Sequence, residues 1–396
     1  MIAPERREEH ERAELCIVAP LPGMRHLLTG GGRSSTGGIQ TQWAALLRCL
    51  RGRGWPLTVI TESDGSSGAS VSMDGMRILS AAPHAGSVRR LARALEAWRL
   101  LKAADSDIYL MQGAGPWAAV AAAFSRAHNR RFIFWLASDT DAMCRASAGS
   151  RLRRAWRVLA WWGIKRADAV IVQTRRQQQL VRHYLGQNAT VVPNVCVSGA
   201  RDATDSPCGP VLWVSNIRWE KRPLRALQLA EALPQVGLTM IGGPVRGQEG
   251  LYDEVKRQAA CLPNVSFLGP LPFSQADGYF ASASLLLNTS AVEGFPNTFL
   301  QAWWWGLPVV STFDPDEVIC RHGFGVHAQS LEGLVAAVGG LLSKAHVRQA
   351  MGRAAQAHVR SVHGQEHVLR LLEGVIRQVK SNREADCPWR SEGVAA

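Results

Sequence analysis

The sequence predicts an α/β protein with two domains, each built on a parallel sheet that helices cover on both faces. The 396 residues exceed what one ordinary core uses, which favours two domains. Short unbroken apolar runs alternate with helical patterns, as in sheets buried on both faces. The alternation stops once, at 195–210, where small and polar residues with proline indicate a linker. Two Rossmann-like domains joined in this way are expected to face a central cleft.

The individual elements follow from hydrophobic spacing, because unbroken runs favour parallel strands and 3.6-residue periodicity favours helices. In the first half, strands are predicted at 15–20, 57–61, 107–112, 131–137, 169–174 and 190–194, and helices at 39–53, 87–104, 116–128 and 150–166. In the second half, strands are predicted at 211–216, 238–243, 265–269, 284–289 and 307–312, and helices at 223–233, 249–261, 274–281, 297–305, 331–343 and 346–361.

This pattern divides the chain into four segments. We expect a first Rossmann-like domain at 14–198 and a second at 208–362. A C-terminal helix at 363–381 is expected to return to the first domain, and a disordered tail is expected at 382–396. Ligands of open parallel sheets bind beyond the carboxyl ends of the strands, so the loops from strand to helix hold the candidate site residues.

The excess positive charge lies in the first half of the chain. The net charge is +13, and residues 1–200 hold 27 Lys and Arg against 14 Asp and Glu, whereas residues 201–396 hold 18 of each. A basic surface attracts phosphate on nucleic acid, on anionic lipid or on a phosphorylated ligand. A nucleic-acid-binding protein is the weaker interpretation, because no known binding motif accompanies the charge.

The eight cysteines form no CxxC pair and no cluster with histidine, so the sequence predicts neither a metal site nor a disulfide framework. This cysteine usage fits a reducing compartment. The polar start of the chain is unlike a secretion signal, and no apolar run is long enough to span a membrane. We therefore expect a cytoplasmic protein.

The most specific motif lies in the segment 284–312. A buried strand is followed by a loop containing Glu293 and Gly294, and then by a helix that Gly306 and Pro308 terminate. The start of such a helix directs backbone N–H groups at a ligand and favours a diphosphate. The carboxylate of Glu293 can accept hydrogen bonds from sugar hydroxyls, and Gly294 permits close approach of the backbone.

The run EGFPN at 293–297, between two predicted strands and opening a helix, resembles the donor site of the family 4 retaining glycosyltransferases, which have the GT-B fold. The resemblance implies that Glu293 contacts the donor sugar. The family has a second Glu eight residues later, which hydrogen-bonds the nucleotide ribose, and here that position is Gln301. An amide can still bond a diol; alternatively, Gln301 forms a capping box with Thr298. The resemblance also places Gly294, Phe295, Pro296, Asn297 and Thr298 at the donor.

A second segment, VLWVSNIRWEKRP at 211–223, is similar to the family's cationic loop, where an Arg and a Lys contact the donor diphosphate. Lys221 matches the family's Lys. Asn216 occupies the usual Arg position, and Arg218 is the candidate to replace it. Two cations would stabilise the charge that develops on a leaving diphosphate. The alternative is that Lys221 and Arg218 are ordinary surface cations beside Glu220.

Two further segments match the family in the first half. The family has a glycine pair after the first strand that packs against the donor phosphates, and Gly37 and Gly38 match it. Polar residues after the strand at 131–137 contact donor or acceptor in the family, which makes Ser138 and Asp139 candidates on the acceptor side, with Asp141 beside them. The alternative for Ser138 and Asp139 is capping of a helix.

The resemblance implies a retaining, metal-independent hexosyltransferase that uses a nucleotide diphosphate sugar, with UDP, GDP or ADP left open, and no other cofactor. The residues proposed as catalytic are Glu293, Lys221 and Arg218. Two alternatives within the fold are an inactive partner subunit, suggested by Asn216 and Gln301, and a nucleotide-sugar epimerase, since fold alone does not decide function.

The predicted helix at 151–166 is basic and amphipathic, with several tryptophans. Such a helix fits an anionic membrane interface; alternatively, it packs on its own sheet with a solvated basic face. The membrane interpretation implies peripheral binding at the cytoplasmic face and a saccharide acceptor that is linked to lipid, in the synthesis of surface polysaccharide or glycolipid.

Overall fold

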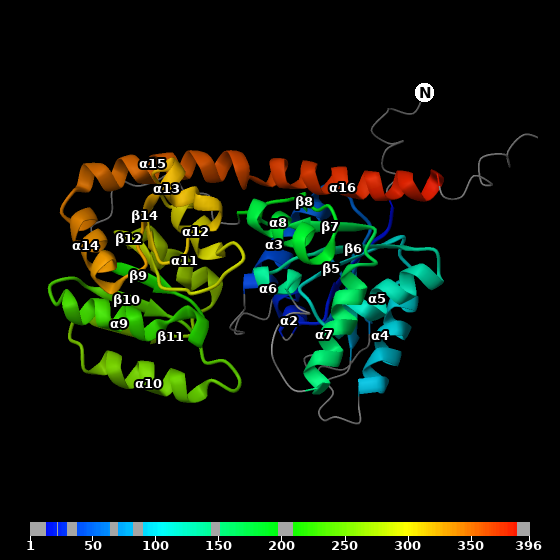
Figure 1. The fold of residues 1–396 in the computed structure, drawn as a ribbon, viewed down its shortest axis with the longest axis horizontal. Helices are drawn as coiled ribbons and strands as arrows, with labels where there is room; N and C mark the ends of the chain where they lie inside the picture. Colours follow the sequence, from blue (N-terminus) through cyan, green and yellow to red (C-terminus); the bar gives the residue numbers. More distant parts are fainter. Residues whose placement is uncertain are drawn as a thin grey trace, which may run out of the picture. The chain divides into compact units, whose positions relative to one another are not determined.

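The computed structural model describes residues 13–21, 23–29, 38–63, 70–81, 90–143, 151–196 and 209–385. The chain forms two compact units. Unit 1 comprises Met1–Gly31, Trp43–Pro193 and Val368–Ala396, and unit 2 comprises Gly32–Gln42 and Asn194–His367. Each unit contains one largely parallel sheet with its own helices, which confirms the predicted fold class (Figure 1).

The sheet of unit 1 has the strand order β3-β4-β2-β1-β5-β6-β7-β8. Its strands are β1 (Leu15–Ala19), β2 (Leu57–Glu62), β3 (Ser70–Met73), β4 (Met76–Ala81), β5 (Ile108–Gln112), β6 (Arg131–Trp135), β7 (Ala169–Val172) and β8 (Thr190–Val191). All neighbours are parallel except β3 and β4, which form an antiparallel hairpin at the edge of the sheet. The prediction missed this hairpin, because β3 is short and half exposed. Asp74 and Gly75, both with positive φ, make its turn.

The helices of unit 1 pack closely on this sheet. They are α2 (Met24–Leu28), most of α3 (Gly38–Gly52), α4 (Arg90–Ala104), α5 (Pro116–Ala127), α6 (Asp139–Ala142), α7 (Arg151–Ile164), α8 (Arg175–Leu185) and most of α16 (Gln365–Ala385). Buried residues of α4, α5 and α7, among them Leu101 and Ile164, join strand residues such as Tyr109 and Phe132 in one core. Gly163 of α7 lies so near the backbone of α5 that an added Cβ would meet Ala118 at 2.6 Å.

The sheet of unit 2 is entirely parallel, with the order β11-β10-β9-β12-β13-β14 among the described residues. Its strands are β9 (Val211–Val214), β10 (Leu238–Ile241), β11 (Val265–Gly269), β12 (Leu285–Asn288), β13 (Val309–Ser311) and β14 (Gly325–His327). Successive residues of β12 point to opposite faces: Leu285 and Leu287 belong to one core cluster and Leu286 to another. A strand buried on both faces explains the unbroken apolar runs in the sequence.

The helices of unit 2 cover both of these faces. The first cluster includes α9 (Pro223–Ala232), α10 (Glu249–Ala260) and α14 (Leu331–Leu342). The second includes α11 (Phe273–Ser282), α12 (Asn297–Trp304), α13 (Val318–His322) and α15 (Ala345–Val362). Two 3-10 turns, η2 (Trp219–Lys221) and η3 (Pro315–Glu317), lie in loops after β9 and β13. Phe299 and Trp303 of α12 are fully buried, so this helix is fixed by the core.

The units divide the chain differently from the expected domains at several points. Gly32–Gln42 groups with unit 2 rather than with the first domain, because Gly38 and Gln42 are hydrogen-bonded to residues of unit 2. Helix α16 continues to Ala385, four residues into the segment expected to be a tail. Positions 386–396 and the linker positions 197–208 lie outside the described residues. Across the described part of the chain, no helix combines the length and apolar character that crossing a membrane requires.

Candidate active site

The best-defined polar site of unit 2 lies where the strand order reverses. From β9 the chain adds β10 and β11 on one side, and it then returns to place β12 on the other side of β9. The loops that follow β9 and β12 therefore leave the same edge of the sheet in opposite directions. In open α/β sheets this point forms a ligand-binding crevice. The two segments that the sequence singled out, 211–223 and 284–312, contain these two loops.

Three hydrogen bonds join β9 and the loop after it to the loop after β12. The indole of Trp213 donates to Thr289 Oγ1 (2.9 Å), and the Thr289 hydroxyl donates to the carbonyl of Lys221 (2.7 Å). The N–H of Ala291 donates to the carbonyl of Glu220 (2.7 Å). Arg222 adopts φ 47° to end η2 immediately before Pro223 starts α9. The backbone of Lys221 is thus held against the loop that carries Glu293.

Lys221 and Glu293 form an ion pair at this junction. The ammonium of Lys221 contacts Glu293 Oε1, which also accepts a hydrogen bond from the Ser290 hydroxyl (2.7 Å). Ser290 is oriented in turn by Asn288, whose side-chain oxygen accepts its backbone N–H (3.0 Å). The two charged side chains retain 19% and 14% of their exposure. From the sequence, each of the two residues is expected to contact the same ligand, and the structure brings them together.

The other residues of the cationic loop lie apart from this pair. Arg218 is on the surface, with Nη1 at 3.4 Å from Glu220 Oε1, and both side chains are well exposed. This is the arrangement expected of an ordinary surface pair. Asn216 lies part-buried between β9 and η2. Neither residue contacts Glu293 in the structure, so the second cation of the site is not preassembled there.

Asn297 occupies a structural position at the start of α12. Its Nδ2 donates to the carbonyl of Gly38 (2.8 Å), and its Oδ1 accepts from Gln42 (2.9 Å) and from Asn194 (2.9 Å). A Cβ added to Gly38 would lie 2.9 Å from Asn297 Nδ2, which explains why glycine stands at this position. The side chain of Asn297 is therefore engaged within unit 2. Gly37 lies outside the described residues.

Gln301 lies one turn into α12, and the residue is only 9% exposed. The capping box with Thr298 is not formed, because the helix begins two residues earlier than that motif needs: Pro296 is the N-cap, and no side chain caps the helix. The side-chain amide of Gln301 makes no hydrogen bond to another residue of the described ranges. Gly294 and Pro296 are buried, and Phe295 packs edge-on against Trp303, so the turn before α12 is firmly held.

The polar loop after β6 in unit 1 serves mainly its own backbone. Ser138 is the N-cap of α6 and forms a capping box with Asp141, as the capping alternative predicted. The carboxylate of Asp141 accepts hydrogen bonds from the backbone of Ala137 (2.7 Å), Ser138 (3.2 Å) and Ala114 (3.2 Å). Burial raises the pKa of Asp141, and the three backbone donors oppose this shift.

Asp139 is also engaged. It is buried and pairs with Arg176 Nε at 2.8 Å. The structure therefore shows local roles for Ser138 and Asp139.

Three residues that position the site residues were not predicted from the sequence: Ser290, Gln42 and Asn194. Ser290 lies two residues after the end of β12 and three before Glu293. Gln42 is one turn after Gly38 in α3, and it exchanges hydrogen bonds with the backbone of Val195 (3.0 Å each way). A polar residue one turn after a glycine-rich loop is the only sequence signal for this contact, and its partners are more than 150 positions away.

Comparison with known proteins shows the family to which the chain belongs. The family model described as Glycosyltransferase Family 4 matches residues 36–196, and the model described as Glycosyl transferases group 1 matches residues 210–344. No curated protein sequence matches the chain.

Solved structures are similar over almost the whole chain. Sucrose-phosphate synthase from Thermosynechococcus elongatus has a TM-score of 0.75 at 15% identity and covers 93% of this chain and 100% of its own. HepE from Anabaena, solved in complex with UDP and glucose, has a TM-score of 0.68 at 16% identity, with 93% and 100% covered. WaaG, a glycosyltransferase involved in lipopolysaccharide biosynthesis, has a TM-score of 0.65 at 14% identity, with 90% and 98% covered.

Proposed function

Because the chain belongs to the family 4, group 1 glycosyltransferases, we propose that it is a retaining enzyme that moves a hexose from a nucleotide diphosphate sugar to a saccharide acceptor. It is a glycosyltransferase with the GT-B fold, as predicted. The observation that supports the finer proposal is the Lys221–Glu293 pair at the switch point of unit 2. Because both side chains of this ion pair keep some access to solvent, each of them can release the other and bind a ligand instead.

In this proposal the two members of the pair separate onto two parts of the donor. The ammonium of Lys221 binds the diphosphate, together with the N-terminal end of α12, where the helix dipole favours an anion. Arg218 reaches the same diphosphate by leaving Glu220, its surface partner. The carboxylate of Glu293 accepts hydrogen bonds from sugar hydroxyls, while the Ser290 hydroxyl keeps it in position. The unpartnered amide of Gln301 binds the ribose diol.

The proposed reaction is a front-face displacement. The bond from the anomeric carbon to the phosphate oxygen breaks, and its electron pair goes to the diphosphate, where Lys221 and Arg218 stabilise the developing charge. The acceptor hydroxyl attacks the anomeric carbon from the same face and transfers its proton to the leaving phosphate oxygen. Retention follows from attack on the face that the diphosphate leaves. This route uses neither a dedicated carboxylate base nor a metal.

The proposed activity is tested by incubating the protein with radiolabelled UDP-, GDP- and ADP-sugars and separating transferred label, free sugar and unchanged donor. We expect transfer or slow hydrolysis with one of the three nucleotides. Release of an epimerised nucleotide sugar would instead identify the epimerase alternative. Unchanged donor with all three, in the presence of mixed saccharide acceptors, would favour the inactive partner subunit.

For the acceptor, we propose a saccharide linked to lipid and a peripheral membrane site at α7. In the described part of α7, Gly163 packs on α5, whereas Val158 and Leu159 remain 43% and 44% exposed. Lys165 and Arg166 lie over the rings of Trp161 and Trp162 (4.9 and 5.2 Å), so cations accompany the tryptophans. A helix with one face packed on its own unit and another face that is apolar and basic fits a membrane interface. Packing of this helix on its own unit and binding of its other face to an anionic membrane are therefore compatible with each other.

The membrane proposal is tested by sedimentation with vesicles. We expect binding to vesicles that contain phosphatidylglycerol, release at high salt, and little binding to neutral vesicles, because each cation contributes about 1 kcal/mol near an anionic surface. A variant with Gln at positions 151, 153, 154 and 157 should bind weakly and still hydrolyse the soluble donor. Failure of the parent protein to bind anionic vesicles at low salt would leave a soluble acceptor as the alternative.

A further inference from the structure

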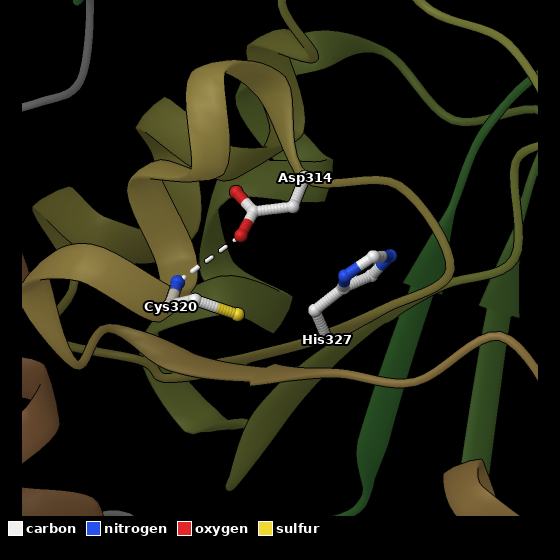
Figure 2. Close-up of side chains that lie close together, drawn as sticks. All are labelled: Asp314, Cys320 and His327. Carbon is white, nitrogen blue, oxygen red and sulfur yellow. Dashed lines mark hydrogen bonds between the residues drawn. The ribbon is translucent and has the colours of Figure 1, made fainter.

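A second polar cluster lies in unit 2, outside the Lys221–Glu293 site. Asp314, Cys320 and His327 each direct one ligand atom to a common point, and these atoms all lie within 4.8 Å of one another (Figure 2). The side chains come from three places: the loop after β13, helix α13 and the last residue of β14. The proposed transfer reaction uses none of them, and the sequence analysis predicted no metal site, because no short spacing links these positions.

The local fold explains how they meet. β13 and β14 are parallel neighbours in which Ser311 pairs with His327, so the loop that carries Asp314 starts beside His327. This loop turns sharply at Asp316 and Glu317, which adopt φ of 52° and 59°. The turn places Asp314 at the start of α13, where its carboxylate accepts from the backbone of Ile319 (2.8 Å) and Cys320 (3.1 Å). Left-handed backbone at two successive non-glycine residues is costly and commonly marks a functional site.

We propose that Asp314, Cys320 and His327 bind a zinc ion. A thiolate, an imidazole and a carboxylate are all zinc ligands, whereas magnesium and calcium avoid the first two. With zinc-to-ligand distances of about 2.0–2.3 Å, tetrahedral ligand atoms lie about 3.5 Å apart. The three side chains must therefore close by about 1 Å, which an exposed Cys320 and a part-buried His327 can do by side-chain rotation. Water supplies the fourth ligand, and the thiol proton leaves to solvent on binding.

The second nitrogen of His327 supports this assignment. Its Nε2 lies 3.4 Å from the carbonyl of Thr312, at the long end of a hydrogen bond. Histidines that bind a metal usually donate their other ring N–H to a carboxylate or a backbone carbonyl, which fixes the tautomer. Such a bond leaves Nδ1 of His327 for the zinc. Figure 2 shows one ring nitrogen of His327 on the side of Asp314 and Cys320.

The zinc would position the loop that reaches the candidate active site, without entering the reaction. The Thr312 hydroxyl donates to the carbonyl of Ser290 (2.8 Å), and its N–H donates to the carbonyl of Asn288 (3.0 Å). Ser290 in turn holds Glu293 (2.7 Å). A zinc ion that closes Asp314 and His327 on either side of Thr312 would therefore stiffen the support of Glu293. Zinc binding itself does not depend on the proposed transferase activity.

The test is zinc stoichiometry and not activity. The full chain is stripped with chelator, reloaded with zinc at pH 7.5, desalted and analysed by atomic emission, with circular dichroism confirming that each variant is folded. We expect about one zinc per chain in the parent, and at least a tenfold weaker affinity in Cys320→Ser and in His327→Ala. Cys261→Ser, which removes another exposed cysteine of unit 2, and His322→Ala, which removes an exposed histidine of α13, should bind as the parent does.

Cobalt gives an independent readout of the ligand set. Cobalt-loaded parent protein should show thiolate-to-cobalt charge-transfer absorption that disappears in Cys320→Ser and persists in Cys261→Ser. Equal zinc affinity in the parent, Cys320→Ser and His327→Ala, or cobalt–thiolate absorption that survives Cys320→Ser, would overturn the site. Chelation should remove the zinc without abolishing transfer, so failure of the zinc proposal and failure of the proposed function are separate results.

Discussion

The loop after β6 in unit 1 and the loop after β12 in unit 2 both follow a buried parallel strand and both carry polar residues. In unit 1, Asp141 accepts three backbone N–H groups and Asp139 pairs with Arg176. In unit 2, Glu293 pairs with Lys221 across two loops, and the side-chain amide of Gln301 makes no hydrogen bond within the described ranges. Both loops follow the end of a strand, so this position does not tell them apart. They differ in their hydrogen-bond partners: the polar residues of the first loop bond within unit 1, whereas those of the second are available to a ligand.

Replacement of Glu293 is expected to have the largest effect. Glu293→Gln should reduce transfer at least about 100-fold while the protein stays folded, because in the proposed mechanism this loop acid contributes to the reaction and not to the core. The rate is measured with labelled donor, and folding is measured by thermal melting. Glu254→Gln, which alters an acid on the surface of α10, is the matched control. Equal transfer by the Glu293 variant and the parent would remove Glu293 from the site.

Asp141 should behave in the opposite way. Asp141→Ala leaves three backbone N–H groups without their acceptor, so it should lower the free energy of unfolding by about 2–3 kcal/mol. Transfer per folded molecule should stay within about twofold, since the carboxylate serves its own loop. Urea unfolding and initial rates measure the two quantities. Unchanged stability with lost transfer would show that the loop after β6 takes part in the reaction. The two loops would then not differ in the way proposed here.

Because His363 is buried next to the residues that hold the start of α12, the stability of unit 2 is expected to depend on pH. The Nδ1 of His363 lies 2.8 Å from the carbonyl of Asn194, and Asn194 bonds Asn297. Burial, with His358 and His367 nearby, lowers the pKa of His363 to about 3. The neutral form is therefore required in the folded state, and its stability contribution is complete above the unfolded pKa of about 6.5 and is lost as pH falls towards 3.

From pH 7.5 to pH 5, His363 alone should reduce the free energy of unfolding by about 2 kcal/mol. His358, whose pKa burial lowers to about 4, adds to the trend. The measurement is urea unfolding at half-unit steps of pH. His363→Gln should flatten the slope, and an unchanged slope in that variant would assign the acid sensitivity elsewhere.

Gln301 is expected to give the smallest effect. Gln301→Ala should raise the KM for the donor about five- to tenfold with little change in kcat, because one hydrogen bond to ribose is worth about 1 kcal/mol. Gln301→Glu should be tolerated, since a carboxylate also accepts from a diol. Initial rates measured over a range of donor concentrations give KM and kcat for each variant. An unchanged KM in the alanine variant would show that the free amide does not meet the ribose.

The fold was largely predictable, because the buried strands are recognisable in the sequence as unbroken apolar runs. Every predicted strand and helix is present, with ends within four residues. The strands β3 and β14 were missed because they are short and only partly buried, and without β3 the hairpin that it forms with β4 was missed as well. The edge strand β14 has only three residues, Gly325–His327, which give no periodicity to detect.

The candidate site was predictable only in part. Lys221 and Glu293 were identified separately from two motifs, but their pairing depends on the strand order, which places β12 beside β9. The roles of Ser290 and Asn297 depend on hydrogen bonds that no local pattern encodes. The cluster of Asp314, Cys320 and His327 likewise forms only when β14 lies beside β13. Strand ends can be predicted from composition, whereas the partners at those ends require the folded chain.

The central claim is that unit 2 holds a nucleotide diphosphate sugar through Lys221 and Glu293, and nucleotide binding measured by isothermal titration calorimetry tests it most directly. UDP, GDP and ADP are titrated into the parent, into Lys221→Gln, and into Lys256→Gln, which alters an exposed lysine of α10. We predict that one nucleotide binds the parent and the Lys256 variant equally, and the Lys221 variant at least about tenfold more weakly, since a charge-assisted bond to phosphate is lost. Equal binding by all three proteins, or binding of none of the nucleotides, would contradict the account.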